Sequence, residues 1–239
     1  MVLVMGGIFA VSAHAEYMAS PGHPGWMAAE GSGCLVWNGA PAAGETTTWS
    51  GPCKGNRANG YGVHVWRNSG KKETARYVGE MHDGKPTGSG TKVWANGDRY
   101  EGNWFDGRKS GHGTFVWAIG DRYEGDLVDG KRSGHGTYVW ANGNRYEGNW
   151  VDGKQTGLGK MTKANGDWYD GEWSGGYAYG EGKAKINGKK YRGAWARGCL
   201  RSMKQRVAWE VPRHQCPYKR GTALVMTRVE HGQNPSREC

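Results

Sequence analysis

The sequence lacks the residue patterns on which most enzymes and metal sites depend. It contains no G-x-x-x-x-G-K-[ST] phosphate loop, no C-x-x-C pair and no visible Ser/His/Asp or Cys/His constellation. Beyond residue 15 it has no apolar run that approaches the ~20 residues of a membrane-spanning helix. These absences argue against an enzyme, a small-molecule substrate, a metal ion and any other cofactor.

Phenylalanine is also scarce, with 3 residues, and the aromatic content is carried by 13 Trp and 12 Tyr instead. Glycine is abundant: 43 of the 239 residues are Gly, against a usual share of ~7%. Such a composition is typical of some disordered chains, yet a chain with this many large aromatic side chains has ample surface to bury. The glycines must therefore serve particular positions, and a fixed period is the pattern to look for.

A 23-residue period organises the middle of the chain. Tyrosines recur at this interval from Tyr77 to Tyr169, and Tyr191 follows after 22 residues. Each copy reads Y-x-G-x-W, then D-G-K/R, then G-x-G-T, an aromatic pair and a turn. Upstream the period continues with less fidelity, since Trp49 takes the place of the tyrosine and Cys53 that of the tryptophan. The predicted array covers residues 31–198, with regular copies from residue 77 and divergent copies in residues 31–76.

Two short strands in each copy account for this pattern. Asn96-Gly97 and Asn142-Gly143 lie between apolar-aromatic runs, and Asn-Gly is typical of a two-residue hairpin turn because both residues accept φ > 0. The connection from Asp-Gly-Lys to G-x-G is expected to be longer and irregular. Since every connection is short, successive strands must pair antiparallel in order. We therefore predict an all-β fold: a single elongated, twisted antiparallel β-meander of stacked hairpin repeats.

The pattern resembles the MORN repeat (membrane occupation and recognition nexus), a β-hairpin of the form Y-x-G-x-W followed by G-x-G. The resemblance covers about residues 31–198, and Met81 and Leu127 depart from it where tryptophan is expected. It implies stacked hairpins, and arrays of this kind are often linked to anionic lipids. Residues 199–239 do not match the repeat; with 8 basic and 3 acidic side chains, they are expected to form a basic C-terminal cap.

Strand alternation assigns the side chains of each copy to two faces. With Asn96-Gly97 as a two-residue turn, Trp94 lies opposite Arg99 and Val93 opposite Tyr100. The expected structural face then collects Tyr100, Gly102, Trp104, Thr91 and Val93. The other face is the predicted binding surface, for an extended protein segment, a glycan or a second copy of the chain. Its predicted binding residues are Trp94, Phe115, Trp117, Tyr138, Trp140, Arg99, Arg122 and Arg145, beside Glu101, Glu124 and Glu147. The alternative is that the arginine stems stack on the tryptophan rings, so that these side chains contact one another and bind no partner.

The two ends of the chain carry different signals. Residues 1–15 are mostly apolar and end in Ala-His-Ala, which predicts a signal peptide cleaved after Ala15 and a periplasmic or secreted protein. Residues 16–30 are expected to be a disordered or extended segment. Export permits disulfides, and the spacing favours two of them, one at each end of the array, with Cys239 left over. The predicted pairs are Cys34 with Cys53 and Cys199 with Cys216.

Two polar features of the repeat could suggest a metal or acid/base site, but neither has the residues that such a site needs. His112 and His135 share one position in adjacent copies, but no third ligand recurs beside them. The aspartates of the D-G-K/R motif are ordinary turn residues, each followed by a cation two positions on. These cations form a basic row along the loop edge: Lys85, Arg108, Lys131 and Lys154.

The sequence therefore predicts an exported, non-enzymatic repeat protein that binds or scaffolds a protein partner through its sheet surface, with self-association as one mode. The alternative is peripheral association with anionic phospholipid membranes through the basic row. That alternative ranks second because Asp83 and its equivalents largely neutralise the row. Nucleic acid is not an expected partner, because export separates the protein from it.

Overall fold

The structure is a computed structural model that describes residues 25–201, 207–212 and 215–216. The predicted signal peptide, residues 16–24 and Cys239 lie outside these residues. Within them, no helix has the length and apolarity needed to cross a membrane.

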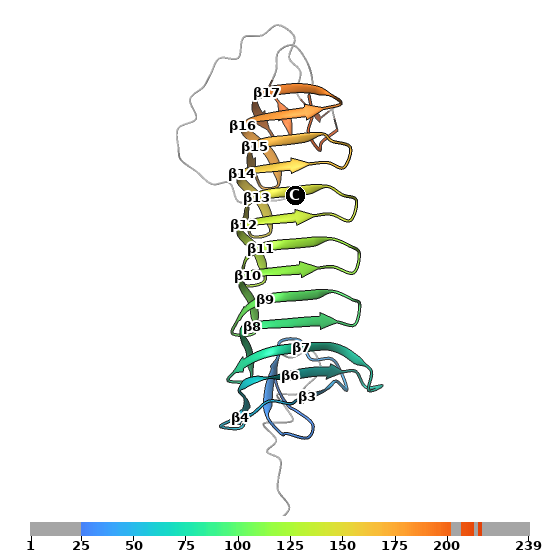
Figure 1. Cartoon of the computed structure of the whole chain (residues 1–239), viewed down its shortest axis with the longest axis vertical. Coiled ribbons are helices and arrows are strands. Elements are labelled where there is room, and N and C mark those ends of the chain that lie inside the picture. The colour runs from blue at the N-terminus through green and yellow to red at the C-terminus, as the bar shows by residue number, and fades with distance from the viewer. Residues whose placement is uncertain (1–24, 202–206, 213–214, 217–239) are drawn as a thin grey trace, which may run out of the picture.

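Most of the described chain forms one 14-stranded antiparallel sheet in which strands follow one another in chain order from β6 to β18, with β3 on the outside of β6 (Figure 1). This confirms the predicted all-β meander of stacked hairpins. Its strands are β3 (Thr46–Trp49), β6 (Gly60–Arg67), β7 (Glu73–His82), β8 (Lys85–Trp94), β9 (Arg99–Phe105), β10 (Arg108–Val116), β11 (Arg122–Val128), β12 (Lys131–Val139), β13 (Arg145–Val151), β14 (Lys154–Thr162), β15 (Trp168–Ser174), β16 (Tyr177–Ile186), β17 (Lys189–Ala196) and β18 (Cys199–Leu200).

The two kinds of hairpin connection are the reverse of the prediction. Asp106-Gly107 is the two-residue turn: Phe105 pairs with Arg108, and both turn residues have positive φ (48° and 80°), as a type I′ turn requires. The Asn96-Gly97 connection is instead a three-residue loop, as the hydrogen bond from the backbone N–H of Trp94 to the Asp98 carbonyl at 2.9 Å shows. Gly97 closes this loop with a φ of 93°, the arrangement of a hairpin loop that ends in a G1 bulge.

The extra loop residue shifts the strand register by one position. Val93 pairs with Arg99, and Lys92 pairs with Tyr100, so the predicted pairing of Val93 with Tyr100 is wrong. A one-residue shift exchanges the two faces of a strand. Thr91 and Val93 therefore leave the tyrosine side of the sheet, and Lys92 and Trp94 take their place.

Each hairpin also bends at its G-x-G pair. On β10 the register jumps between Lys109, which pairs with Trp104, and Gly113, which pairs with Gly102. The first glycine of the pair, Gly111, has a φ of 72°, and a bulge of this kind turns the strand sharply. Figure 1 shows the strands curving back along one line of the sheet. We call the side inside this bend, which carries the tyrosines, the inner face, and the opposite side the outer face.

A tyrosine and tryptophan ladder fills the bend. The repeat tyrosines are completely buried at positions 77, 100, 123, 146 and 169. Trp104 lies edge-on to Tyr77 and Tyr100, with ring centroids 5.4 and 5.2 Å away, and its Nε1–H donates to the Gly90 carbonyl at 3.0 Å. The same hydrogen bond recurs from Trp150 to Gly136. Wherever the tryptophan is present, these contacts join a copy to the one before it.

The N-terminal end carries a second, four-stranded sheet that the sequence analysis did not predict. Its strands, in the order β1-β2-β5-β4, are β1 (Gly25–Ala28), β2 (Leu35–Asn38), β4 (Cys53–Lys54) and β5 (Arg57–Ala58). The expectation that residues from 31 onward stack as a further copy of the array is therefore wrong for β2. Backbone hydrogen bonds from Trp37 to Gly84 and from Glu30 to Thr47 tie this sheet to the main one. We call it the N-terminal cap.

Both predicted disulfides are confirmed, with Cα–Cα distances of 5.7 Å for Cys34–Cys53 and 5.4 Å for Cys199–Cys216. The first closes the N-terminal cap. The second ties the described part of the segment after β18 to the end of the array. There the backbone N–H of Trp209 donates to the Gly198 carbonyl at 2.6 Å. We call the described residues from 207 to 216 the C-terminal cap.

Candidate binding surface

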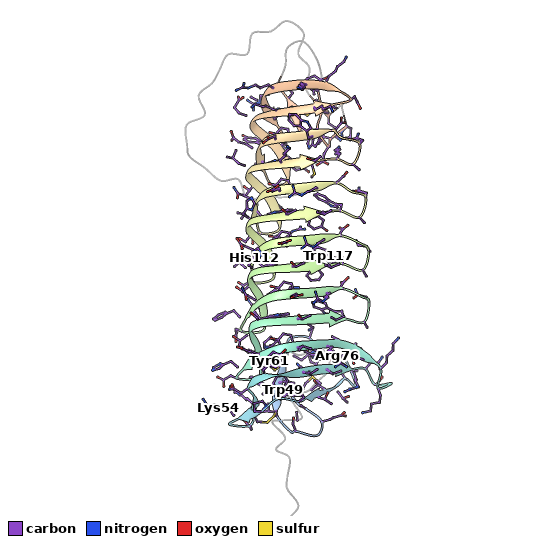
Figure 2. The ribbon with its side chains drawn as sticks, viewed as in Figure 1. Trp49, Lys54, Tyr61, Arg76, His112 and Trp117 are labelled. Atoms are coloured by element: carbon purple, nitrogen blue, oxygen red, sulfur yellow. A yellow bond between two sulfur atoms is a disulfide. The ribbon has the colours of Figure 1, made fainter. Side chains whose placement is uncertain are left out.

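Five of the eight predicted binding residues lie together on the inner face. Their rings form a continuous row, which we call the inner strip: Trp94, Phe115, Trp117, Tyr138 and Trp140. Successive ring centroids along the row are 5.6, 4.3, 5.3 and 4.6 Å apart. Tyr138 is buried and the other four rings are partly exposed. Figure 2 shows Trp117 beside the three-residue loop and His112 at the bend.

The three predicted arginines lie on the other side of the sheet. Arg99 pairs with Val93 and is exposed, whereas Phe115 pairs with Tyr100 and Tyr123 and so shares their face. The prediction that aromatic rings and arginines form one surface is therefore wrong. Its physical cause is the loop length, because the register that would unite them requires a two-residue turn at Asn96-Gly97.

Three cations that the sequence analysis missed lie among the rings of the inner strip. The Lys92 Nζ lies 5.3 Å from the Trp94 ring and 4.0 Å from that of Trp66. The Lys109 Nζ lies 5.4 Å from the Trp94 ring and 4.7 Å from that of Phe115. Across the next copy, the Arg132 guanidinium lies 4.8 Å from the Tyr138 ring and donates to the Gly153 carbonyl at 2.8 Å. Lys109 and Arg132 lie 23 residues apart in sequence, so the period already placed them at equivalent positions of two copies.

Burial disfavours the charged form of these three side chains. It lowers the pKa of Lys92 to about 8, with repulsion from Lys109 adding to the effect and Glu45 opposing it. Burial also lowers the pKa of Lys109 and that of Arg132. The inner strip is therefore a row of aromatic rings in which positive charges are partly removed from water.

Several cations on the outer face and along the loop edge form ion pairs instead. Arg99, Arg122 and Arg145 each bind the glutamate two residues on, at 2.6 to 2.7 Å. The hydrogen bond from Arg122 lowers the pKa of Glu124. Three of the four cations of the basic row bind the Asp-Gly aspartate of the following copy: Lys85–Asp106 at 2.6 Å, Arg108–Asp129 at 3.2 Å and Lys131–Asp152 at 3.1 Å. Exposed pairs of this kind add little stability, but they neutralise the surface.

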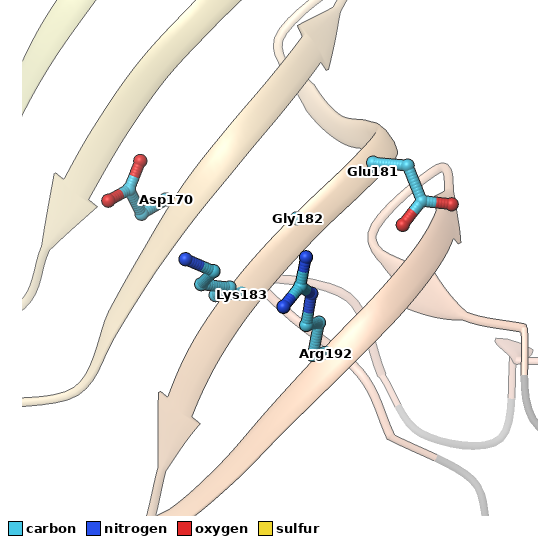
Figure 3. Close-up of a pocket in the computed structure, with 5 residues that line it drawn as sticks. All are labelled: Asp170, Glu181, Gly182, Lys183 and Arg192. Atoms are coloured by element: carbon cyan, nitrogen blue, oxygen red, sulfur yellow. The ribbon is translucent and has the colours of Figure 1, made fainter.

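Two other clusters of polar side chains lie on the described surface. Figure 3 shows a shallow outer-face depression where Asp170 and Glu181 lie near Lys183 and Arg192, all exposed and of mixed sign. His112 contacts a single carboxylate, with its Nδ1 3.2 Å from Asp126 Oδ1. In the part of the chain that the structure describes, no group of three His, Cys, Asp or Glu side chains is placed to hold a metal ion.

Comparison with known proteins identifies the repeat. The family model of the MORN repeat matches residues 54–71, 77–99, 100–122, 123–145 and 146–168. The hairpins of β15 to β17 lie outside these matches and keep the same pairing of glycine with glycine. MORN repeats form modules that bind proteins or membranes, and the family is generally non-enzymatic.

Two further comparisons add little. A solved structure, the SAS-4 (dCPAP) TCP domain in complex with a proline-rich motif of Ana2 (dSTIL) of Drosophila melanogaster, is 15% identical. The alignment covers 54% of this chain and 82% of that one with a TM-score of 0.25, which supports no argument about fold or function. A search of curated proteins found no match.

Proposed function

We propose that this chain, whose residues 54–168 carry MORN repeats, binds an extended segment of a partner protein along the inner strip and so acts as a scaffold. The observation that carries the proposal is the continuous row of partly exposed aromatic rings on the inner face. Among the described residues, no aromatic ring of the N-terminal or C-terminal cap packs on the five rings of the strip. Rows of partly exposed aromatic rings are enriched at protein interfaces.

The size of the strip suits a short polypeptide. Two strands per copy, each ~4.8 Å wide, give a spacing of about 10 Å between equivalent residues. The strip runs from Trp94 to Trp140, three equivalent positions, and so extends over about 20 Å. An extended segment of about six residues has this length.

The ends of the array favour this side-on mode over end-to-end self-association. Unpaired edge strands promote pairing between chains. At the N-terminal end, Glu30 of the cap forms a bridge to Thr48 on the edge strand β3. At the other end, β18 has two residues, and Cys199 pairs with Ala208 of the C-terminal cap. Both edges are therefore covered.

Association with an anionic membrane is the weaker alternative. Three of the four cations of the basic row, Lys85, Arg108 and Lys131, are each paired with an aspartate. Lys154 is the one member of the row without an ion pair among the described residues, so little net charge is left to attract lipid headgroups. Salt-sensitive sedimentation with anionic vesicles, abolished by neutralising Arg108 and Lys131, would favour the membrane instead. The disulfides suit an oxidising compartment, and we propose export on that ground together with the predicted signal peptide.

Selection of a displayed peptide library against the full chain tests the proposal. Enriched peptides should bind Trp117→Ala about 30-fold more weakly, because removing a central aromatic side chain from an interface costs about 2 kcal/mol. Phe105→Ala is the matched control, since this ring is 71% exposed on the outer face. Peptides that respond to Phe105→Ala and ignore Trp117→Ala, with both variants folded by circular dichroism, would refute the proposal.

A further inference from the structure

Two cations of the inner strip lack the ion-pair partners that their neighbours in sequence have. Lys109 and Arg132 form no ion pair among the described residues, whereas Arg108 and Lys131, their neighbours in sequence, bind Asp129 and Asp152.

The acidic groups nearest to Lys109 and Arg132 are already engaged. Asp98 Oδ1 accepts the Ala118 N–H at 2.8 Å, and Asp121 accepts the Ala141 N–H and the Tyr138 hydroxyl. The inner strip therefore has unused capacity for a carboxylate that comes from outside the array.

The C-terminal cap shows what the inner face accepts. Lys163 occupies the copy position of Trp94, Trp117 and Trp140, and its Nζ lies 4.6 Å from the Trp209 ring and 3.7 Å from Glu210 Oε1. Trp209 packs in turn on Tyr169, with ring centroids 6.1 Å apart. Here an aromatic and an acidic side chain, adjacent in one non-repeat segment, occupy the inner face together.

The N-terminal cap follows the same rule. Glu45, in the loop before β3, accepts a hydrogen bond from Asn38 of β2 at 2.8 Å, and its negative charge opposes the lowering of the Lys92 pKa. At each end of the strip a carboxylate from a non-repeat segment thus lies near an inner-face lysine. Lys109 and Arg132 have near them only the array's own Asp98 and Asp121, which accept hydrogen bonds from the array itself.

We propose that the partner segment is acidic, and that two of its carboxylates pair with Lys109 and Arg132 while its apolar or aromatic side chains pack between the rings of the inner strip. This inference rests on the proposed function, and it adds the chemistry of the partner. The bond expected at Arg132 is a charge-assisted hydrogen bond to a carboxylate, which planar guanidinium geometry favours.

The spacing of the two cations restricts the conformation of the segment. Their positions recur one copy apart, at about 10 Å. A polyproline II segment places residues i and i+3 on one side about 9.3 Å apart, which matches this repeat. In a β-strand, same-side residues are about 6.6 or 13 Å apart, and neither distance fits. Carboxylates three residues apart on a polyproline II segment are therefore the expected pattern.

Defined peptides test the inference. The probes are fluorescently labelled (Trp-Pro-Glu)4 and its neutral counterpart (Trp-Pro-Gln)4, with fluorescence anisotropy as the readout on the full chain. We expect the glutamine peptide to bind at least 10-fold more weakly. Lys109→Gln and Arg132→Gln should each weaken the glutamate peptide about 3-fold to 10-fold and leave the glutamine peptide unchanged. Arg108→Gln is the matched control, because it removes the same charge from the loop edge and should change neither affinity.

The outcomes separate the two proposals. Equal binding of the two peptides, still sensitive to Trp117→Ala, would overturn the acidic partner and keep the strip as a protein-binding surface. Failure of both peptides to bind would overturn both. Vesicles of phosphatidylglycerol and phosphatidylcholine form the third arm: vesicle binding that Lys109→Gln and Arg132→Gln abolish, without an effect on the peptides, would assign these cations to lipid and overturn the inference. Lys109→Met, which keeps the apolar stem, replaces Lys109→Gln if the latter does not fold.

Discussion

Substitution of one repeat glycine tests the packing on which the whole array depends. In Gly113→Ala, the new Cβ would lie 2.6 Å from Tyr100 Cε2 and 2.7 Å from Tyr100 Cζ, closer than non-bonded carbons approach. Gly113 needs no unusual backbone conformation, so the effect is steric. Tyr100 cannot yield easily, because its ring is completely buried and its hydroxyl donates to the Asn103 carbonyl at 2.9 Å.

Two responses bound the loss of stability. If the ring shifts within its site, the variant suffers overpacking, which destabilises by about 1–3 kcal/mol. If the ring leaves the site, about 150–250 Å² of aromatic surface is exposed, and at about 25 cal/mol per Å² this amounts to about 4–6 kcal/mol. We therefore expect a loss of about 2–5 kcal/mol in the free energy of unfolding. For a chain of this size, each kcal/mol lowers Tm by about 2–4 °C.

Urea denaturation followed by tryptophan fluorescence measures this loss. Gly39→Ala is the matched control, because its nearest neighbour, Trp37 Nε1, would be 4.0 Å from the new Cβ. The control should stay within about 0.5 kcal/mol of the parent chain. If Gly113→Ala falls in the same range, the tyrosine does not require glycine beneath it, and glycine is not what makes room for the rings of the inner face.

Three other perturbations have outcomes that the structure fixes. Leu127→Trp should stabilise the chain by about 0.5–1.5 kcal/mol, because it restores the missing rung of the tyrosine and tryptophan ladder and can donate to the Gly113 carbonyl; a lower Tm than the parent would contradict this. Because burial holds the pKa of Lys92 at about 8, below its ordinary 10.5, the folded chain releases this proton first, and stability should rise by roughly 1.5 kcal/mol from pH 8 to 9.5. Urea titrations in which Lys92→Met shows the same rise would assign it to another group. Replacing Cys34 and Cys53 with serine should destabilise the N-terminal cap by ~3 kcal/mol and accelerate amide exchange in β1 and β2, whereas exchange in β11 to β13 should be unaffected. Uniform acceleration along the array would contradict that local effect.

The repeat, the strand order and the disulfides could be predicted because each depends on local or periodic information. A 23-residue period with glycine two residues after each tyrosine leaves little choice of fold, and short connections leave little choice of topology. The structure places Trp49 over Gly51 and Gly62 as it places Tyr77 over Gly79 and Gly90. The substitution of Trp49 for tyrosine was therefore readable from the sequence.

The choice of face could not be predicted, because it depends on a single residue in a loop. Asn96-Gly97 suits a two-residue turn, but the hydrogen bonds of Asp98 favour a three-residue loop over it. Its side chain accepts the Ala118 N–H of the next copy, and its carbonyl accepts the Trp94 N–H. These bonds link neighbouring copies and favour the three-residue loop. Asp-Gly then supplies the two-residue turn at the other end of the hairpin, where the sequence analysis expected an irregular connection.

The corrected register changes what the surface can bind. In the predicted register, each tryptophan lies beside an arginine that already has a glutamate partner, so the surface is satisfied by itself. In the observed register, those pairs remain on the outer face, and the rings meet Lys92, Lys109 and Arg132 on the inner face. A cation over an aromatic ring keeps free directions for hydrogen bonding that an ion pair does not. The one-residue difference in the loop therefore separates the rings from the self-neutralised arginine–glutamate pairs and places them beside Lys109 and Arg132, the arrangement on which the proposal of an acidic partner rests.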